Sequence, residues 1–163
     1  MTVANEQVPA CQTRWWTRRD FKPALAIERE AFDVPWTHVD FVNCLNSPNT
    51  VGMVAERSGT FAGFCIYQMY GHHLHLFSIA VAANQRRSGI GRALVDNLKG
   101  KLSLRHRHKI SCEVRETNLG AQLFFKSLGF RARFIARNFY DDFDEDALVV
   151  EFALPETRKA LPR

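Results

Sequence analysis

The sequence predicts an α/β protein built on a mixed β-sheet. Apolar residues recur with helical spacing in some segments and form short, nearly continuous runs in others. These segments follow one another in the order strand, two helices, three strands, helix, strand, helix and two strands. The chain has 163 residues, of which 46% are hydrophobic and 24% charged, as expected of a globular domain with its own core.

The first half of the chain is expected to hold two helices and four strands. The first helix, Phe21–Phe32, is amphipathic, and Thr37 is suited to cap a second helix that ends at Leu45. A turn at 57–60 separates two segments rich in strand-forming residues and predicts a hairpin. The expected strands are Thr13–Trp16, Thr50–Glu56, Phe61–Tyr70 and Leu74–Val81.

The second half is expected to hold two helices and three strands. In the expected helix Ile90–Leu102, leucines recur every four residues. Gly129 follows the other helix, and glycine is the residue type that most often ends a helix. The remaining elements are a strand at Lys109–Val114, a helix at Asn118–Leu128, and strands at Phe130–Asn138 and Ala147–Leu154 around an acidic loop at 141–146.

Composition and charge exclude several classes of protein. The chain lacks the run of ~20 apolar residues that spans a membrane, and its start does not resemble a signal peptide. The four cysteines lie far apart, which favours free thiols and a cytoplasmic location. The net charge of +5 favours an anionic partner. No linker or repeat interrupts the chain, so one domain is expected over 1–163, with 1–10 and 156–163 as loose ends.

The polar segment Arg86–Gly91 follows a strand and opens a helix. Gly89 and Gly91 allow the backbone to approach a ligand closely, while the helix N-terminus and the arginines add positive charge. These are the properties of a pyrophosphate-binding turn. The segment matches neither a P-loop nor a dinucleotide-binding fingerprint, which needs a third glycine where Leu94 stands. From spacing alone, a turn that merely starts a helix is an equally good interpretation.

Two parts of the sequence resemble the signature of the GNAT superfamily of acetyltransferases. Leu76–Val81 followed by Gln85–Leu94 is similar to the acetyl-CoA-binding half of that signature. Glu113–Asn118 and Phe125–Phe130 are similar to its second half. The resemblance implies a single-domain GNAT fold, in which about four helices flank a mixed, mostly antiparallel central sheet.

Within the superfamily, the chain is most similar to the RimI type, which acetylates the N-terminal alanine of a small-subunit ribosomal protein. Pro35–Thr37, the Glu-Val-Arg strand and Arg137–Tyr140 carry this narrower likeness, and the resemblance covers about 14–155. It implies acetyl-CoA as co-substrate and a protein N-terminus, such as that of a ribosomal protein, as acceptor. Neither nucleic acid, nor a membrane, nor a metal is expected as a partner.

The resemblance also gives roles to particular residues. Glu113 matches the general base that takes a proton from the attacking amine. Without the resemblance, a surface glutamate in a salt bridge is the better interpretation. Main-chain groups of the strand would align the acetyl-pantetheine arm, and Asn118 would contact the co-substrate. The residues expected to bind acetyl-CoA are Ile79, Ala80, Val81, Arg86, Arg87, Ser88, Gly89, Ile90, Gly91, Arg92, Asn118 and Phe125.

One position departs from the family pattern. Relatives usually carry Tyr where this chain has Phe125, and that tyrosine is assigned to protonating the departing thiolate. Tyr140 is the first candidate to supply the proton instead, although the family more naturally makes it a contact to the substrate peptide. Two alternatives stay open: a GNAT enzyme that acetylates a small-molecule amine, and a non-catalytic acyl-CoA-binding module.

Three other groups of residues are weaker candidates. His73 and His75 alternate onto one face of a strand, but no recognised metal-binding spacing accompanies them, so no metal site is expected. Cys112 beside Glu113 suggests an acetyl-cysteine route, yet a cysteine buried in the core is the commoner case. The acidic run 141–146 would either attract a cationic N-terminus or form only a solvated turn.

Overall fold

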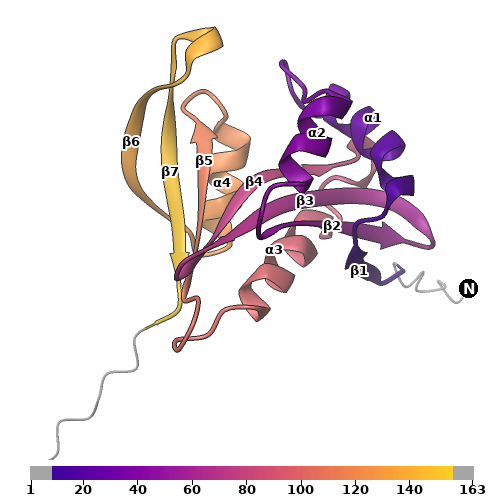
Figure 1. The fold of residues 1–163 in the computed structure, drawn as a ribbon, viewed down its shortest axis with the longest axis horizontal. Helices are drawn as coiled ribbons and strands as arrows, with labels where there is room; N and C mark the ends of the chain where they lie inside the picture. The colour runs from indigo at the N-terminus through magenta and orange to yellow at the C-terminus, as the bar shows by residue number, and fades with distance from the viewer. Residues whose placement is uncertain (1–8, 156–163) are drawn as a thin grey trace, which may run out of the picture. The chain divides into compact units, whose positions relative to one another are not determined.

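The computed structural model describes residues 9–155. Within this range the chain forms four α-helices and seven β-strands, which confirms the predicted α/β class (Figure 1). The predicted loose ends fall outside the described residues, apart from positions 9 and 10. The elements are, in order, β1 (Cys11–Trp15), α1 (Phe21–Ala31), α2 (His38–Leu45), β2 (Thr50–Arg57), β3 (Thr60–Tyr70), β4 (His73–Val81), α3 (Ile90–Gly100), β5 (Lys109–Arg115), α4 (Leu119–Ser127), β6 (Arg131–Tyr140) and β7 (Glu145–Ala153).

The strands form one sheet in the order β1-β2-β3-β4-β5-β7-β6. The pairs β1–β2, β5–β7 and β6–β7 are antiparallel, whereas β4 and β5 are parallel, so the predicted mixed, mostly antiparallel sheet is confirmed. The parallel pairing covers three residues of each strand, and its last pair is His75 opposite Ser111. Glu113 therefore follows two residues after this last pair.

Two predicted helix caps are confirmed. The Thr37 hydroxyl accepts a hydrogen bond from the Asp40 N–H, while the Asp40 carboxylate accepts one from the Thr37 N–H. Asn118 caps α4 through its side-chain oxygen, which accepts a hydrogen bond from the Ala121 N–H at 3.0 Å. Gly129, with φ of +87°, follows α4 in the left-handed conformation that favours glycine.

Contacts divide the chain into two compact units. Unit 1 extends to Ile66 and resumes at Ser78–Asn97, and unit 2 consists of Tyr67–Phe77 and the described residues from Leu98 onward. Strands β3 and β4 contribute to both units. None of the helices within residues 9–155 is long and apolar enough to cross a membrane.

The core of unit 1 lies where α1 and α2 cover strands β3 and β4. Its buried members come from all four elements and are Ala24, Ile27, Phe41, Phe64, Ile66 and Ala80. The Trp16 ring packs against Phe41 and Phe64, with centroids 5.7 Å away in each case. A Cβ at Gly52 would lie 2.8 Å from the Trp16 Cβ, so only glycine leaves room for this packing.

Unit 2 is organised by the alternation of β5. Ile110, Cys112 and Val114 are buried, so Ser111 and Glu113 lie on the other face of the strand. The long hairpin of β6 and β7 completes this side of the sheet (Figure 1).

The prediction of an acidic loop over 141–146 is wrong at its end. Asp141–Phe143 form a short 3₁₀ turn, and β7 already begins at Glu145. The Glu145 carboxylate accepts hydrogen bonds from the hydroxyl and N–H of Thr117, and these bonds help to lower its pKa. Specific partners therefore hold this residue in a strand, although a run of acids is typical of a solvated turn. The predicted helix Ile90–Leu102 likewise ends earlier, at Gly100.

Candidate active site

Glu113 lies on β5 with about one fifth of its side chain exposed. Its Oε2 atom is 3.0 Å from Nε2 of His75 on the neighbouring strand β4. The His75 ring also contacts Ser111, with 3.2 Å between Nδ1 and the hydroxyl oxygen. The carboxylate of the predicted general base is thus held in a specific hydrogen-bonding environment.

Tyr140, at the end of β6, is brought to Glu113. Its hydroxyl donates a long hydrogen bond of 3.5 Å to the main-chain carbonyl of Glu113. Burial raises the pKa of Tyr140 to about 12, and the nearby Cys112 and Glu113 add to the rise. The phenol therefore keeps its proton at neutral pH and can act as a donor.

Arg115 packs against the Tyr140 ring, a role that the sequence analysis missed. Its guanidinium carbon lies 4.8 Å from the centroid of Tyr140 and 4.2 Å from that of Phe143. Its Nη1 atom is 3.6 Å from Oε2 of Glu145. Strand alternation places Arg115 on the same face as Glu113, and Arg115 also belongs to the Glu-Val-Arg strand of the family resemblance, but neither signal identified Tyr140 as its partner.

Cys112 points to the buried face of β5 and donates a weak hydrogen bond to the Glu113 carbonyl. Burial, followed by the charge of Glu113, raises the pKa of the Cys112 thiol well above its ordinary value. Because the thiolate is the nucleophilic form, the environment disfavours an acetyl-cysteine route.

In unit 1, the glycine-containing turn before α3 is held from one side. Arg57 donates a 2.7 Å hydrogen bond to the Ser88 carbonyl, and the Ser88 hydroxyl donates to the Gln85 carbonyl. Arg87 and Gly89 have φ of +57° and +87°, so both adopt the left-handed conformation. A Cβ at Gly89 would meet nothing within 4 Å, so the turn is open on its outer side. An open, cationic turn at a helix N-terminus fits an anionic group.

The strand segment before this turn is approached closely by β3. A Cβ at Gly63 would lie 2.7 Å from the Ala80 carbonyl oxygen and 3.3 Å from the Val81 Cα. The side chain of Arg86 donates from Nε to the Val81 carbonyl at 3.2 Å. Of the residues predicted to align the pantetheine arm, Ile79–Val81, the last two are therefore closely packed by β3, and Val81 is also held by Arg86 within unit 1.

Phe125 is 2% exposed and belongs to an aromatic cluster in unit 2. Its ring centroid is 5.1 Å from that of Phe124 and 5.0 Å from that of Phe130. Asn118, seven residues earlier, serves as the cap of α4. The contact of these two residues with acetyl-CoA stays a prediction.

The predicted site residues thus fall into two groups. Glu113, Tyr140, Asn118 and Phe125 belong to unit 2, where Glu113 and Tyr140 meet. Ile79–Val81 and the turn from Arg86 to Arg92 belong to unit 1.

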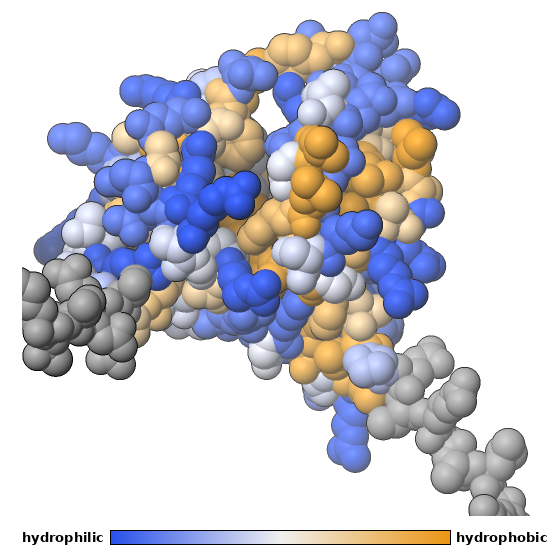
Figure 2. All heavy atoms as spheres, turned by 180° about the vertical axis from the view of Figure 1, so that it is seen from behind, coloured by the Kyte–Doolittle hydropathy of each residue, from blue (hydrophilic) through white to orange (hydrophobic). Residues whose placement is uncertain are grey.

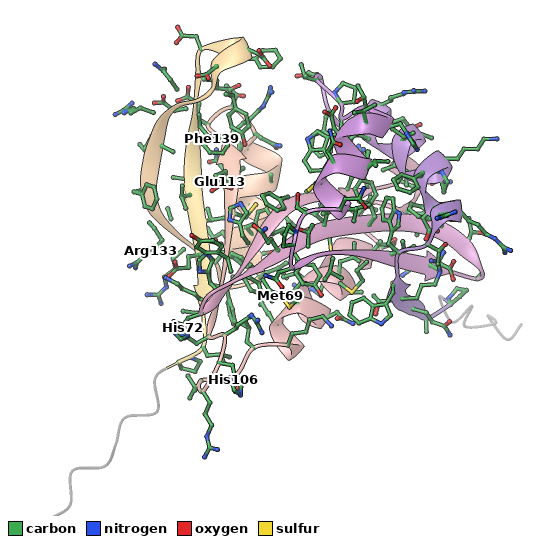
Figure 3. The ribbon with its side chains drawn as sticks, in the orientation of Figure 1. Met69, His72, His106, Glu113, Arg133 and Phe139 are labelled. Atoms are coloured by element: carbon green, nitrogen blue, oxygen red, sulfur yellow. The ribbon has the colours of Figure 1, made fainter. Side chains whose placement is uncertain are left out.

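Two other histidines of unit 2, His72 and His106, lie away from this region. Figure 3 shows Glu113 and Phe139 toward one end of unit 2, with His72 and His106 toward the opposite end. Nδ1 of His72 is 3.0 Å from the His106 carbonyl oxygen, a contact that ties two loops together. Among the residues that the structure describes, no cluster of His, Cys, Asp and Glu is arranged to hold a metal ion.

Apolar side chains also reach the surface of unit 2. On the face drawn in Figure 2, hydrophobic and hydrophilic residues lie side by side. Leu119 and Leu123 on α4 are 62% and 56% exposed, and Phe134 on β6 is 61% exposed.

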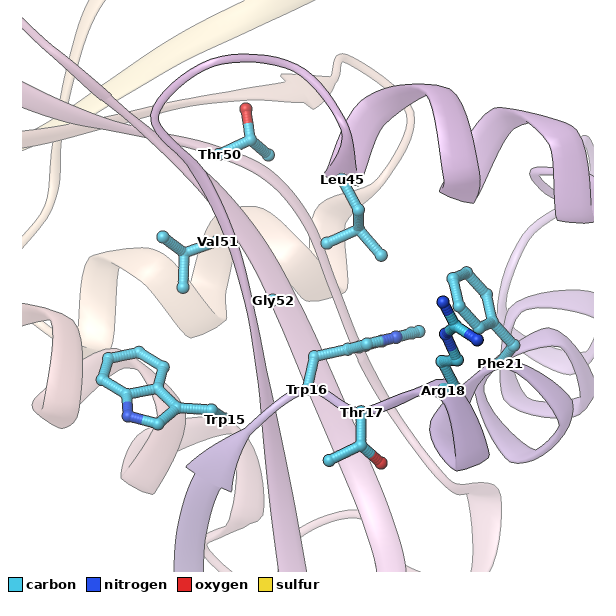
Figure 4. A pocket seen from close by; sticks show the side chains of 9 residues that line it. All are labelled: Trp15, Trp16, Thr17, Arg18, Phe21, Leu45, Thr50, Val51 and Gly52. Carbon is cyan, nitrogen blue, oxygen red and sulfur yellow. The ribbon is translucent and has the colours of Figure 1, made fainter.

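Unit 1 contains an open pocket of about 500 Å³ beside Trp15 and Trp16 (Figure 4). Leu45, Phe21 and Gly52 also line it, and no predicted site residue does. Its nine lining residues include no carboxylate, histidine or cysteine, so it offers no acid or base for acyl transfer.

Comparison with known proteins gives a consistent result. The profile of the Acetyltransferase (GNAT) family matches residues 12–130. The ribosomal protein bS18-alanine N-acetyltransferase of Escherichia coli K12 is 34% identical over 138 residues, which are 83% of this chain and 91% of that protein. The enzyme of the same description from Salmonella typhimurium LT2 is 32% identical with the same coverage. The crystal structure of the E. coli ribosomal-protein-S18-alanine N-acetyltransferase superposes with a TM-score of 0.80 at 29% identity, covering 94% of this chain and 100% of that one.

Proposed function

Because the chain belongs to the GNAT acetyltransferase family, whose members use acetyl-CoA, we propose that it acetylates the α-amine of a protein N-terminus, such as that of a ribosomal protein. The observation that carries the proposal is the contact of the Tyr140 hydroxyl with the main-chain carbonyl of Glu113 in unit 2, since it places a group that can donate a proton beside the residue whose carboxylate would accept a proton. Its relatives from E. coli and Salmonella are described as acting on the alanine of a ribosomal protein. The predicted cytoplasmic location and single-domain organisation are part of the same proposal.

The reaction needs a base because a peptide N-terminus has a pKa of about 7.7–8.0 and is mostly protonated at pH 7. Glu113 would take that proton, directly or through a water molecule. The neutral amine nitrogen then bonds to the acyl carbon of the thioester and the carbon–sulfur bond breaks. As the amide forms, the nitrogen loses its second proton, which would restore the proton that Tyr140 gives up. Tyr140 would give its proton to the departing thiolate, a role that Phe125 has no hydroxyl to fill.

The turn from Arg86 to Arg92 would hold the pyrophosphate through main-chain N–H groups and positive charge. Its openness at Gly89 and its support by Arg57 are consistent with that task. Ile79–Val81 would align the pantetheine arm, and bound acetyl-CoA supplies the activated acyl group.

The central test compares Glu113→Gln with the parent enzyme on a panel of N-terminal peptides. We expect kcat/KM to fall at least about 100-fold, as is typical when a general base is lost, while acetyl-CoA affinity by calorimetry stays within about twofold. Glu151→Gln is the matched control, because Glu151 is also on this sheet, is 20% exposed and forms an ion pair with Lys109. Tyr140→Phe should lower kcat rather than acetyl-CoA affinity.

Three results would contradict the proposal in distinguishable ways. Full activity of Glu113→Gln would show that Glu113 is not the general base. Turnover of free amines but not of peptides would indicate the small-molecule alternative. Tight acetyl-CoA binding with no acceptor turned over would indicate the non-catalytic module that Phe125 keeps open. If Phe125→Tyr raises turnover, the missing hydroxyl limits the parent enzyme.

A further inference from the structure

We propose that His75 is a positioning residue that holds the Glu113 carboxylate in the orientation needed to accept a proton. The inference rests on the proposed role of Glu113 as general base. It concerns a residue whose only sequence signal was its place in a histidine-rich strand.

The strand pairing brings the three groups together. His75 is opposite Ser111 in the last pair of the parallel β4–β5 register, and Glu113 is two residues further along the same face of β5. Nε2 of His75 is 3.0 Å from Oε2 of Glu113, and Nδ1 is 3.2 Å from the Ser111 hydroxyl. Both ring nitrogens of His75 therefore have a partner, and both partners lie on β5.

The site is also built to keep the ring in place. The edge of Phe77, two residues along β4, packs against His75 with centroids 4.8 Å apart and the planes at 71°. The side chains of His75 and Glu113 are 20% and 19% exposed, so the contact is largely shielded from solvent. A loose surface ion pair would have neither the second partner nor the aromatic neighbour.

The hydrogen-bonding chemistry favours one arrangement. Contact with a carboxylate requires a proton on Nε2 of His75. The Ser111 hydroxyl can donate to Nδ1 when the ring is neutral and accept from it when the ring is charged. Ser111 thus supports the ring in either state, and the carboxylate keeps its Oε2 on His75. Oε1 is then the oxygen that would take the proton from the amine.

Loss of this support should affect catalysis through Glu113 alone. We expect His75→Ala to lower kcat about 10-fold, because small errors in the placement of a reacting group are costly, with acetyl-CoA affinity by calorimetry within twofold. His75→Gln can still present an N–H to Oε2 and should recover most of the activity. Added imidazole should partly restore His75→Ala. His73→Ala, on the same face of β4 but two residues earlier, is the matched control and should leave kcat unchanged.

A double-mutant cycle separates positioning from a general structural role. Adding His75→Ala to Glu113→Gln should lower kcat no further, since the supported carboxylate is already gone. The denaturation midpoints of the two single variants and the double variant, measured without substrates, should be non-additive as well. If His75→Ala does not fold, Ser111→Ala provides the second variant. It should lower kcat about threefold in the parent enzyme and have no effect on kcat in the Glu113→Gln background.

The outcomes distinguish this inference from the function on which it rests. Unchanged kcat in His75→Ala, with a large loss in Glu113→Gln, overturns the positioning role and leaves the proposed function standing. If His75→Ala lowers kcat by the same factor in the parent and in the Glu113→Gln background, the positioning role is also overturned, because His75 would then act independently of Glu113. Full activity of Glu113→Gln refutes the general base and, with it, the role of His75.

Discussion

Glu28 is a carboxyl group buried in unit 1, and its charge should make the stability of that unit depend on pH. It is 2% exposed; its Oε1 accepts a 3.0 Å hydrogen bond from the Trp36 N–H, and its buried Oε2 has no hydrogen-bond partner among the described residues. Burial raises the pKa of Glu28 from the ordinary 4.5 to about 7, although the Trp36 N–H acts in the opposite direction.

The direction and the size of this pH effect on the free energy of unfolding follow from proton linkage. Between pH 4.5 and 7 the folded state keeps the Glu28 proton while the unfolded state loses it, so the free energy of unfolding falls as pH rises. Each tenfold change in proton affinity corresponds to about 1.4 kcal/mol, so the total loss from this group reaches about 3 kcal/mol by pH 8. Glu28→Gln has no proton to lose and should lack this component.

The assay is urea unfolding at pH 5 and pH 8, followed by tryptophan fluorescence. All three tryptophans, Trp15, Trp16 and Trp36, belong to unit 1 and report on the unit that contains Glu28. The parent protein should lose about 2.5 kcal/mol more than Glu28→Gln between the two pH values, because a small part of the total loss has already occurred by pH 5. Glu30→Gln makes the same charge change on the exposed face of α1 and should behave like the parent. Parallel pH dependence in the parent and Glu28→Gln would refute the reasoning.

Two further predictions concern unit 1. Gly63→Ala should raise the KM for acetyl-CoA about threefold or more, because the new methyl group would lie 2.7 Å from the Ala80 carbonyl oxygen. Gly100→Ala is the control, since its methyl group would meet nothing within 4 Å, and equal KM values for the two variants would contradict the prediction. Asp20→Asn should lower the free energy of unfolding by about 2–3 kcal/mol, since the buried Asp20 accepts two 2.8 Å hydrogen bonds from Arg14. Urea unfolding followed by tryptophan fluorescence measures the loss, and a loss below about 1 kcal/mol would contradict a stabilising role of the Arg14–Asp20 ion pair.

Most of the fold could be predicted because its signals are local. The helical spacing in α1, the capping box at Thr37 and the glycine at 129 each depend on a few neighbouring residues. The start of β7 could not be predicted in this way. Glu145 is a poor strand former, and its place in the sheet depends on Thr117 and Arg115, which are about 30 positions away in the chain.

The candidate site shows the same division. Alternation places Glu113 on a face of β5, and the family resemblance singles it out, but neither identifies its partner. His73 and His75 lie on the same face of β4 and look equivalent in the sequence. Only the register of the parallel pair, with His75 opposite Ser111, decides which of them meets the carboxylate. Register between distant strands is a tertiary property, so sequence reasoning considered His75 only as a weak candidate for a metal ligand and did not connect it with Glu113.

The position of Tyr140 also depends on strand pairing, in this case on an irregularity of β6. Ala136 is opposite Ala147 and Tyr140 is opposite Glu145, so three residues of β6 face the single residue Asp146. Asp146 accepts hydrogen bonds from the Asn138 N–H at 2.8 Å and from Arg137 at 2.6 Å, and these two contacts hold the pKa of Asp146 below its usual range. Asn138, with φ of +49°, makes the turn within the bulge. The last acid of the run thus anchors a bulge at the end of which the Tyr140 hydroxyl meets the Glu113 carbonyl, so Asp146 contributes to the structure of the candidate site.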